Sequence, residues 1–209
     1  MRVLPCLFLL SILYVMITVE CADSSEDLDL KVKAFLDEQQ HKWRDMNVPY
    51  ADGKLLYDLI LKNGYTRALE IGTSTGHSSI WMAWALSKTG GELVTIEINK
   101  GRRDEALRNF DKVGLSDYID SRFGDAHAMV KELEGPFDFV FSDADKDWYK
   151  QYFIDIYPKL ETGGCFTAHN VRNPYGGIQE FLDYVTNHSQ METTIDKTTR
   201  AGISISYKK

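Results

Sequence analysis

The sequence predicts an α/β fold: a doubly wound, mostly parallel seven-stranded sheet that ends in an antiparallel strand pair. Three observations point to this fold. Short β-branched and aromatic runs alternate with segments of helical period, which favours a parallel sheet with helices on both faces. A glycine turn, Gly72 to Gly76, follows the first run of the alternating series. Only residues 196–201 separate the last two runs, which is too short for a crossover helix and favours a hairpin.

The first expected helix runs from Asp27 to Trp43, because its apolar residues recur at helical spacing. Pro49 starts a new segment, since the residue before a proline favours an extended conformation. Further helices are expected over Asp52–Leu61, Ser78–Ser87, Arg102–Val113, Ala126–Leu133, Lys146–Leu160 and Ile178–Asn187. Strands are expected over Arg67–Ile71, Leu93–Ile98, Tyr118–Phe123, Phe137–Ser142, Gly164–Ala168, Glu192–Ile195 and Gly202–Tyr207.

Length and composition are those of one globular domain. The chain has 209 residues, of which 44% are hydrophobic and 26% charged, so it can bury a substantial core. The formal net charge of −7 argues against nucleic acid as a partner, because phosphate binding needs a basic face. We therefore expect a small-molecule partner. The sequence does not decide between a monomer and a homodimer.

Residues 1–21 differ in kind from the rest and resemble a secretory signal peptide. Arg2 precedes an almost wholly apolar run from Val3 to Val19, and the small residues Cys21 and Ala22 follow. Cleavage there would leave residues 22–209 as a single domain that is secreted, lumenal or periplasmic. The alternative is an uncleaved anchor, since a run of roughly 17 residues is about the shortest that spans a bilayer. Only in that case would the protein contact a membrane.

Polar residues follow several of the expected strands at the point where each ends. In parallel sheets of this kind, ligands bind at the carboxyl ends of the strands. The residues found there are the glycine turn, Glu97, Asp125, Asp143 and the pair His169-Asn170. We expect them to meet at one edge of the sheet and to form the functional site.

The segment "ALEIGTSTGHSS" and Glu97 predict a nucleoside cofactor. An acidic residue at the end of the second strand can accept hydrogen bonds from both hydroxyls of a ribose. A dinucleotide would require glycine at the positions of Ser74 and His77, so that pattern fails twice. S-adenosylmethionine has no pyrophosphate and needs no such pattern. Glu70, the glycine turn, Glu97 and Asp125 offer partners for its amine, carboxylate, ribose and adenine.

Six segments from about Trp43 onward resemble the S-adenosylmethionine-dependent O-methyltransferases of the catechol and caffeoyl-CoA type, which have a Rossmann-like class I methyltransferase fold. They are "MNVPYADGKLLYDLI", "ALEIGTSTGHSS", "TIEINK", "GDAHAMV", "FDFVFSDADKDWY" and "GGCFTAHNV". The resemblance implies a cofactor site whose residues here are Met46, Val48, Glu70, Gly72, Thr73, Gly76, Ser78, Glu97, Asp125, Ala126 and Asp143.

The same resemblance makes Asp143 a metal ligand and Lys146 the catalytic base. A phenol titrates near a pKa of about 10 and is mostly neutral at working pH. A divalent cation would acidify and orient the hydroxyl, and a lysine could then take the proton. This chemistry fits methyl transfer to an oxygen nucleophile.

One position departs from the family pattern, in which the fifth strand usually ends in Asp-Asn and both residues bind the metal. Here the pair is His169-Asn170. Magnesium prefers oxygen ligands, whereas imidazole suits transition metals. A transition metal could be bound by Asp143, His169 and Asn170, or magnesium could be held by Asp143, Asn170 and waters. Without a metal, His169 could be the general base, or it could only bond to backbone.

The expected function is methyl transfer from S-adenosylmethionine to a hydroxyl of a small phenolic or catechol-like acceptor, assisted by a divalent cation. One alternative is a metal-independent methyltransferase that uses His169 or Lys146 as the base. The other is a secreted module that binds S-adenosylmethionine without turnover. This alternative stays open because the cofactor is made in the cytosol, so a secreted enzyme would have no ready supply of it.

Overall fold

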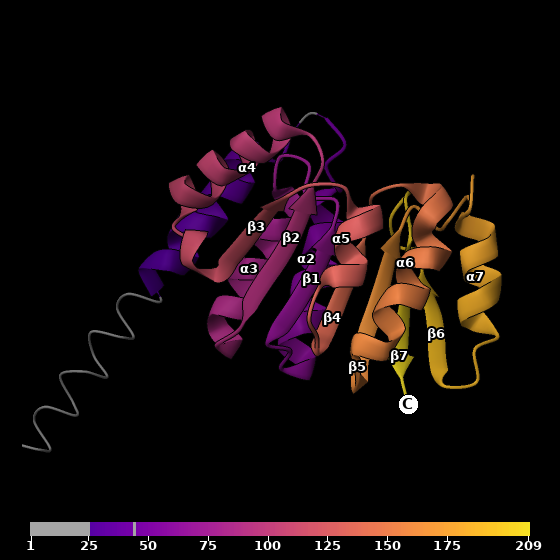
Figure 1. Cartoon of the computed structure of the whole chain (residues 1–209). Coiled ribbons are helices and arrows are strands. Elements are labelled where there is room, and N and C mark those ends of the chain that lie inside the picture. Colours follow the sequence, from indigo (N-terminus) through magenta and orange to yellow (C-terminus); the bar gives the residue numbers. More distant parts are fainter. Residues whose placement is uncertain (1–25, 44) are drawn as a thin grey trace, which may run out of the picture.

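The computed structural model describes residues 26–43 and 45–209, so the expected signal peptide lies outside the described residues. The chain forms a seven-stranded sheet in the order β3-β2-β1-β4-β5-β7-β6, flanked by helices (Figure 1). The strands are β1 (Arg67–Ile71), β2 (Glu92–Glu97), β3 (Ile119–Phe123), β4 (Phe137–Ser142), β5 (Leu160–His169), β6 (Met191–Asp196) and β7 (Ile203–Lys208).

Strand pairing confirms the predicted fold class. The pairs β1–β2, β1–β4, β2–β3 and β4–β5 are parallel. The pairs β5–β7 and β6–β7 are antiparallel, as the short connection between the last two strands predicted. The sheet is therefore mixed, with the antiparallel pair at one edge.

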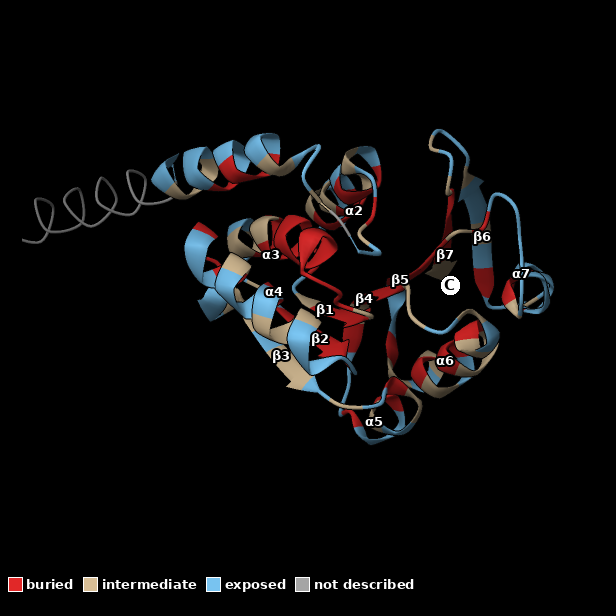
Figure 2. Cartoon of the chain, turned by 90° about the horizontal axis from the view of Figure 1, so that it is seen from above, coloured by how far each residue is buried: buried red, intermediate tan, exposed pale blue. Residues whose placement is uncertain are grey.

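Helices cover both faces of the sheet. A first helix spans residues 26–39. The others are α2 (Tyr50–Asn63), α3 (His77–Thr89), α4 (Lys100–Val113), α5 (Ala126–Glu132), α6 (Tyr149–Ile156) and α7 (Ile178–Thr186). Seen from above, α2, α3 and α4 lie on one face and α5, α6 and α7 on the other (Figure 2). Among the described residues, no helix has both the length and the apolar character needed to cross a membrane.

Central strand β4 shows how the core forms on both faces. Phe139 and Phe141 are fully buried in the cluster that includes Leu56 of α2 and Met82 of α3. Val140, between them, is buried in the cluster that includes Phe153 of α6. Successive side chains of a strand point to opposite faces, so a wholly apolar strand fits only between two covered faces.

The expected helix from Lys146 to Leu160 is shorter and broken in the structure. A 3-10 turn at Lys146–Trp148 precedes α6, and a second one at Tyr157–Lys159 follows it. Pro158 lies in the second turn and has no N–H for a helical hydrogen bond, which explains the end of α6. Strand β5 then begins at Leu160, four residues before the expected start.

Candidate active site

The glycine turn brings the ends of β1 and β4 into close contact. Gly72 has a φ of 104°, and a Cβ at this position would lie 3.0 Å from the backbone carbonyl carbon and oxygen of Asp143. Its N–H donates to the carbonyl of Ile96 in β2, and the N–H of Asp143 donates to the carbonyl of Ile71. Glycine is needed here because a side chain would push the two strand ends apart.

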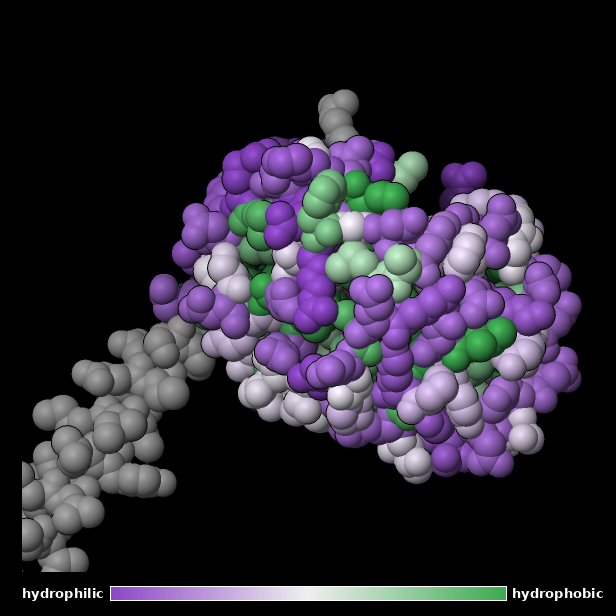
Figure 3. All heavy atoms as spheres, in the orientation of Figure 1, coloured by the Kyte–Doolittle hydropathy of each residue, from purple (hydrophilic) through white to green (hydrophobic). Residues whose placement is uncertain are grey.

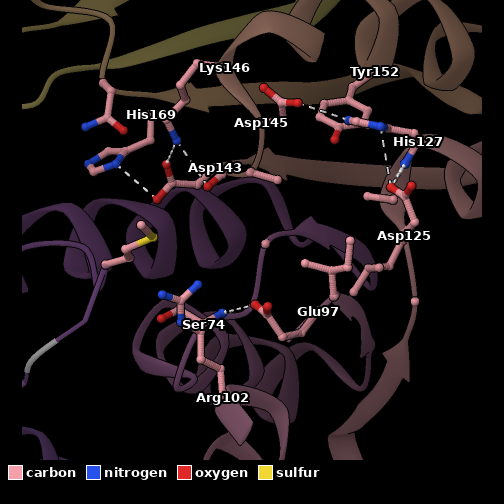
Figure 4. A pocket seen from close by; sticks show the side chains of 18 of the residues that line it. Ser74, Glu97, Arg102, Asp125, His127, Asp143, Asp145, Lys146, Tyr152 and His169 are labelled. Carbon is pink, nitrogen blue, oxygen red and sulfur yellow. Dashed lines mark hydrogen bonds and ion pairs between the residues drawn. The ribbon is translucent and has the colours of Figure 1, made fainter. Parts of the chain in front are cut away.

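Glu97 lies at the end of β2 and is 6% exposed. Its Oε2 accepts a hydrogen bond from the backbone N–H of Ser74 at 2.7 Å (Figure 4), and its Oε1 accepts one from the N–H of Asn99 at 2.8 Å. Two backbone donors thus fix the carboxylate at the cavity wall. Each oxygen keeps a lone pair that can accept a hydrogen bond from a ligand.

Glu70 is buried behind the glycine turn. The hydroxyls of Ser78, Ser79 and Thr95 all donate to its carboxylate. Burial raises the pKa of Glu70 to about 7, and the three hydroxyls offset part of that rise. Glu70 therefore ties β1 to β2 and to the first turn of α3.

A segment at residues 45–48 covers the glycine turn. The hydroxyl of Ser74 donates to the carbonyl of Asp45 at 2.7 Å. Arg102 of α4 makes a bidentate pair with the Asp45 carboxylate, at 2.8 and 2.7 Å. Asn47 donates to the Thr75 hydroxyl at 2.8 Å. These contacts hold the cover over the cavity, where Met46 is largely exposed.

His77 of α3 also holds the segment at residues 45–48. Its Nδ1 lies 2.8 Å from the carbonyl of Val48, and its Nε2 accepts from the indole N–H of Trp81 at 3.1 Å. This pattern makes Nδ1 the protonated nitrogen of a neutral ring. Burial lowers the pKa of His77 to about 4, and the bond to Val48 offsets part of that fall.

At the end of the cavity beyond β3, His127 lies between two carboxylates. Its Nδ1 is 3.5 Å from Asp125 and its Nε2 is 3.3 Å from Asp145. The ring stacks on Trp148 at a centroid distance of 3.8 Å. Asp125 also accepts from the N–H of His127 and so caps α5. His127 and Tyr152 line this end of the cavity together with the carboxylates of Asp125 and Asp145 (Figure 4).

At the opposite end, four charged side chains form a line that we call the charge chain: Asp52, His169, Asp143 and Lys146. Asp52 of α2 accepts from His169 Nε2 at 2.9 Å. His169 Nδ1 lies 3.2 Å from Asp143 Oδ2, a contact without hydrogen-bond geometry. Lys146 donates to Asp143 Oδ1 at 2.5 Å and to its carbonyl at 3.1 Å (Figure 4).

The charge chain is buried, and its members shift each other's ionisation. Burial alone would lower the pKa of His169, but the carboxylates of Asp143 and Asp52 outweigh it and raise the pKa to about 9. Burial alone would raise the pKa of Asp143, but His169 and Lys146 outweigh it and hold that pKa below its usual value. At neutral pH the charge chain therefore contains the carboxylate of Asp143 beside the imidazolium of His169.

Many of these groups line a cavity of about 680 Å³, and the others lie behind its wall. The predicted residues that line it are Met46, Gly72, Glu97, Asp125, Ala126, Asp143, Lys146, His169 and Asn170. The structure thus brings together the ends of β1, β2, β4 and β5, as the sheet topology predicted.

Five predicted cofactor residues do not line this cavity: Val48, Glu70, Thr73, Gly76 and Ser78. The Thr73 hydroxyl bonds to Thr95, and a Cβ on Gly76 would lie 2.5 Å from the ring of Phe110. Their polar or backbone groups face the interior of the protein. In this structure these five residues support the wall, and a direct contact of theirs with a cofactor stays a prediction.

The chain also matches a known protein family. A family model described as O-methyltransferase matches residues 22–203. The chain belongs to the O-methyltransferase family.

Two curated O-methyltransferases illustrate the relationship. A catechol O-methyltransferase of Niastella koreensis is 44% identical over 107 residues, which cover 49% of this chain and 48% of that protein. A caffeoyl-CoA O-methyltransferase of Zea mays is 34% identical over 137 residues, which cover 63% of this chain and 53% of that protein. The chain spans about half the length of the curated relatives that it matches.

Solved O-methyltransferase structures share the fold over most of the chain. One from Bacillus cereus, in complex with SAH, has a TM-score of 0.73 and 26% identity, and covers 88% of this chain and 91% of that one. TomG from Streptomyces achromogenes, in complex with SAM, has a TM-score of 0.73 and 28% identity, and covers 88% of this chain and 89% of that one.

The divalent cation that the resemblance to O-methyltransferases implies has to fit Asp143, His169 and Asn170. Both nitrogens of His169 face carboxylates, and both oxygens of Asp143 face cationic groups. Over residues 26–43 and 45–209, no three His, Cys, Asp or Glu side chains gather as a metal-ion site. A hard cation needs several free oxygen ligands aimed at one point. The residues present here do not fit such a cation.

Sequence reasoning missed several residues that line or support this cavity. Arg102, Asp145 and Tyr152 were not among the predicted site residues, although all three line the cavity. Two of them could have been found from their positions: Arg102 lies in the helix that follows β2, and Asp145 lies just after the end of β4. Asp52 gave no signal, because it lies 117 positions from its partner His169.

Proposed function

We propose that this protein transfers a methyl group from S-adenosylmethionine to a hydroxyl of a small, phenolic or catechol-like acceptor. The observation that supports it most directly is one cavity with Glu97 at the end of β2 and the Asp143–Lys146 pair at the end of β4. The first suits the ribose of a nucleoside cofactor. The second would supply a proton acceptor to an acceptor molecule bound in the same cavity.

Support for the cofactor comes from both chemistry and relatives. The solved O-methyltransferases from Bacillus cereus and Streptomyces achromogenes contain SAH and SAM, respectively. In this chain, Glu97 would accept from the ribose hydroxyls, and Asp125 and His127 would face the adenine. The cover at residues 45–48 would close over the methionine part.

In the proposed reaction, the acceptor oxygen attacks the methyl carbon of the sulfonium. The carbon–sulfur bond breaks and its electron pair stays on sulfur, so a neutral thioether leaves. The hydroxyl proton moves to Nζ of Lys146, which acts in its unprotonated form. Asp143 fixes Nζ through its carboxylate and its backbone carbonyl. His169 has both nitrogens against carboxylates, so it orients Asp143 and does not take the proton.

An aromatic acceptor suits the wall beside Lys146. Tyr175 lines the cavity and is 57% exposed. Its loop is tied to the turn that carries Lys146, because the N–H of Gly177 donates to Asp147 at 2.8 Å. Relatives named for catechol and caffeoyl-CoA support the same acceptor class.

Calorimetry and mass spectrometry test the proposal together. S-adenosylmethionine should bind the protein, and Glu97→Ala should weaken binding by about 10-fold to 100-fold, since it removes a charge-assisted hydrogen bond to the ribose. Phenols and catechols should gain the mass of one methyl group. Cofactor binding without methylation of any acceptor in the panel would contradict the proposal.

A further inference from the structure

We propose that this protein works without a divalent cation, because His169, held by Asp52, supplies the positive charge beside Asp143. The inference rests on the proposed function, since it concerns the same site. It departs from the resemblance, which implies a metal between the residues at the ends of β4 and β5.

The geometry of the charge chain gives the first argument. Asp52 and His169 expose 1% and 6% of their side chains, and they meet at 2.9 Å through Nε2. On the other side of the ring, Nδ1 lies 3.2 Å from Asp143 Oδ2. A neutral ring that donates through Nε2 would leave the bare lone pair of Nδ1 close to a carboxylate. Electrostatic repulsion disfavours that arrangement, so a positive charge is needed at Nδ1, either a proton or a metal ion.

The charges around Asp143 favour the proton. Its Oδ1 already accepts a hydrogen bond from Nζ of Lys146 at 2.5 Å. When Lys146 is unprotonated, as the proposed reaction requires, two carboxylates and one imidazolium give the charge chain a net charge of −1, which offsets the sulfonium of the proposed cofactor. A divalent ion bound by an unprotonated His169 would instead make the charge chain neutral and leave the charge of the sulfonium unbalanced in a buried site. Excess buried charge is strongly unfavourable.

Asp52 is the positioning residue in this arrangement. It lies in the first turn of α2, outside the cavity lining, and touches neither the cofactor space nor Lys146 directly. It acts by holding the His169 ring, whose other nitrogen then lies against the Asp143 carboxylate. Asp143 in turn fixes Nζ of Lys146. Because each member of the charge chain positions the next, we expect a substitution at Asp52 to lower the rate of methyl transfer.

Metal binding gives a test that needs no turnover. Mn²⁺ titrated into the wild-type protein and followed by electron paramagnetic resonance should remain free up to about 1 mM. The double variant Asp52→Asn with His169→Asp restores Asp-Asn at the end of β5 and removes the facing carboxylate. It should bind one Mn²⁺ and gain thermal stability from it.

Stoichiometric Mn²⁺ binding by the wild type would overturn the proposal, and this measurement decides even if the double variant does not fold. A folded double variant that binds no Mn²⁺ would also contradict the proposal, because it would show that His169 and Asp52 are not what prevents the cation from binding.

Turnover provides the second test. Methyl transfer by the wild type should be unchanged by chelator and by added Mg²⁺ or Mn²⁺, whereas restoration of activity by a metal would overturn the proposal. Absence of turnover under every condition would instead count against the proposed function, and the Mn²⁺ titration would still decide the present one.

The role of Asp52 has its own control. Asp52→Asn should lower kcat at least 10-fold while the Kd for S-adenosylmethionine stays within 2-fold. Asp58→Asn on the same helix removes an exposed carboxylate paired with Lys54 and should change neither. If Asp52→Asn lowers thermal stability but leaves kcat of the folded protein unchanged, Asp52 is only structural and the positioning role is wrong.

Discussion

At the glycine-turn end of the cavity, carboxylates are held by neutral donors, whereas at the Asp143 end the charged groups hold one another. Glu97 accepts from two backbone N–H groups, and Glu70 accepts from three hydroxyls. Asp143 instead contacts the cationic side chains of Lys146 and His169. Removal of one neutral donor leaves the others in place, but removal of one charge leaves its partner buried and unpaired.

The difference also fits what each end is proposed to do. The first end binds a cofactor and needs fixed acceptors with lone pairs to spare. The second end moves a proton and needs a group whose ionisation depends on its neighbours. The predictions below test whether the two ends differ in this way.

The largest effect is expected at Lys146. Lys146→Arg keeps a positive charge next to Asp143, but a guanidinium stays protonated and cannot accept a proton. We expect kcat to fall by about 10²-fold to 10⁴-fold, the range for loss of a general base, with little change in cofactor affinity. Lys150→Arg, at an exposed residue paired with Glu180, is the matched control. A rate for Lys146→Arg near that of the wild type would show that Lys146 supplies only charge.

The next largest effect is a loss of stability at His169. His169→Ala leaves Asp52 and Asp143 buried without the imidazolium between them, and should lower the free energy of unfolding by about 3–5 kcal/mol. Urea unfolding followed by circular dichroism measures it. The variant with Asp52→Ala added should lose less than the two single variants together, because the pair is then removed as a unit. Simple additivity would mean that the two side chains are not coupled.

The sequence was sufficient to predict the strands and the edge at which the site lies. Strands β1 and β4 have the predicted bounds. Each is a short apolar run between helical segments, so the sequence leaves little choice of where the strand begins and ends. Because the alternating pattern makes the first five strands parallel, Glu97, Asp143 and Asn170 are expected at the same edge of the sheet. That is why these residues could be singled out.

The sequence was not sufficient to show which polar residues face the cavity and which face the interior. Glu70 precedes the glycine turn and looked like a cofactor contact, yet its carboxylate is enclosed by hydroxyls from α3 and β2. Asp52 looked like an ordinary acidic residue in the first turn of a helix, and only the packing of α2 against the end of β5 brings it to His169. Such contacts depend on tertiary packing, which local pattern does not encode.

The glycine-turn end should be sensitive to acid through His77. Its pKa is lowered from 6.5 to about 4 in the folded protein, so the unfolded chain binds a proton first as pH falls. Stability from the neutral ring is therefore complete above about pH 6.5 and is lost as pH falls toward about 4. The loss should be on the order of 2–3 kcal/mol.

His77→Asn keeps a donor for the carbonyl of Val48 and removes the titrating group. Urea unfolding of both proteins at pH 7 and pH 4.5 should show a smaller loss for the variant, and contributions common to both proteins cancel. Equal losses in the two proteins would assign the acid sensitivity to other groups.

The smallest effect is expected where the glycine-turn end does rely on a charge pair, the bidentate contact of Arg102 with Asp45. This pair is partly exposed, so Arg102→Ala should lower the free energy of unfolding by less than about 1 kcal/mol. The cover at residues 45–48 would lose one tether, and S-adenosylmethionine should bind a few-fold more weakly, mainly through faster dissociation in stopped-flow measurements. Lys100→Ala, which removes an exposed pair with Asp104 on the same helix, should leave dissociation unchanged. An unchanged dissociation rate for Arg102→Ala would mean that Ser74 and Asn47 hold the cover by themselves, and that neutral contacts are sufficient throughout this end of the cavity.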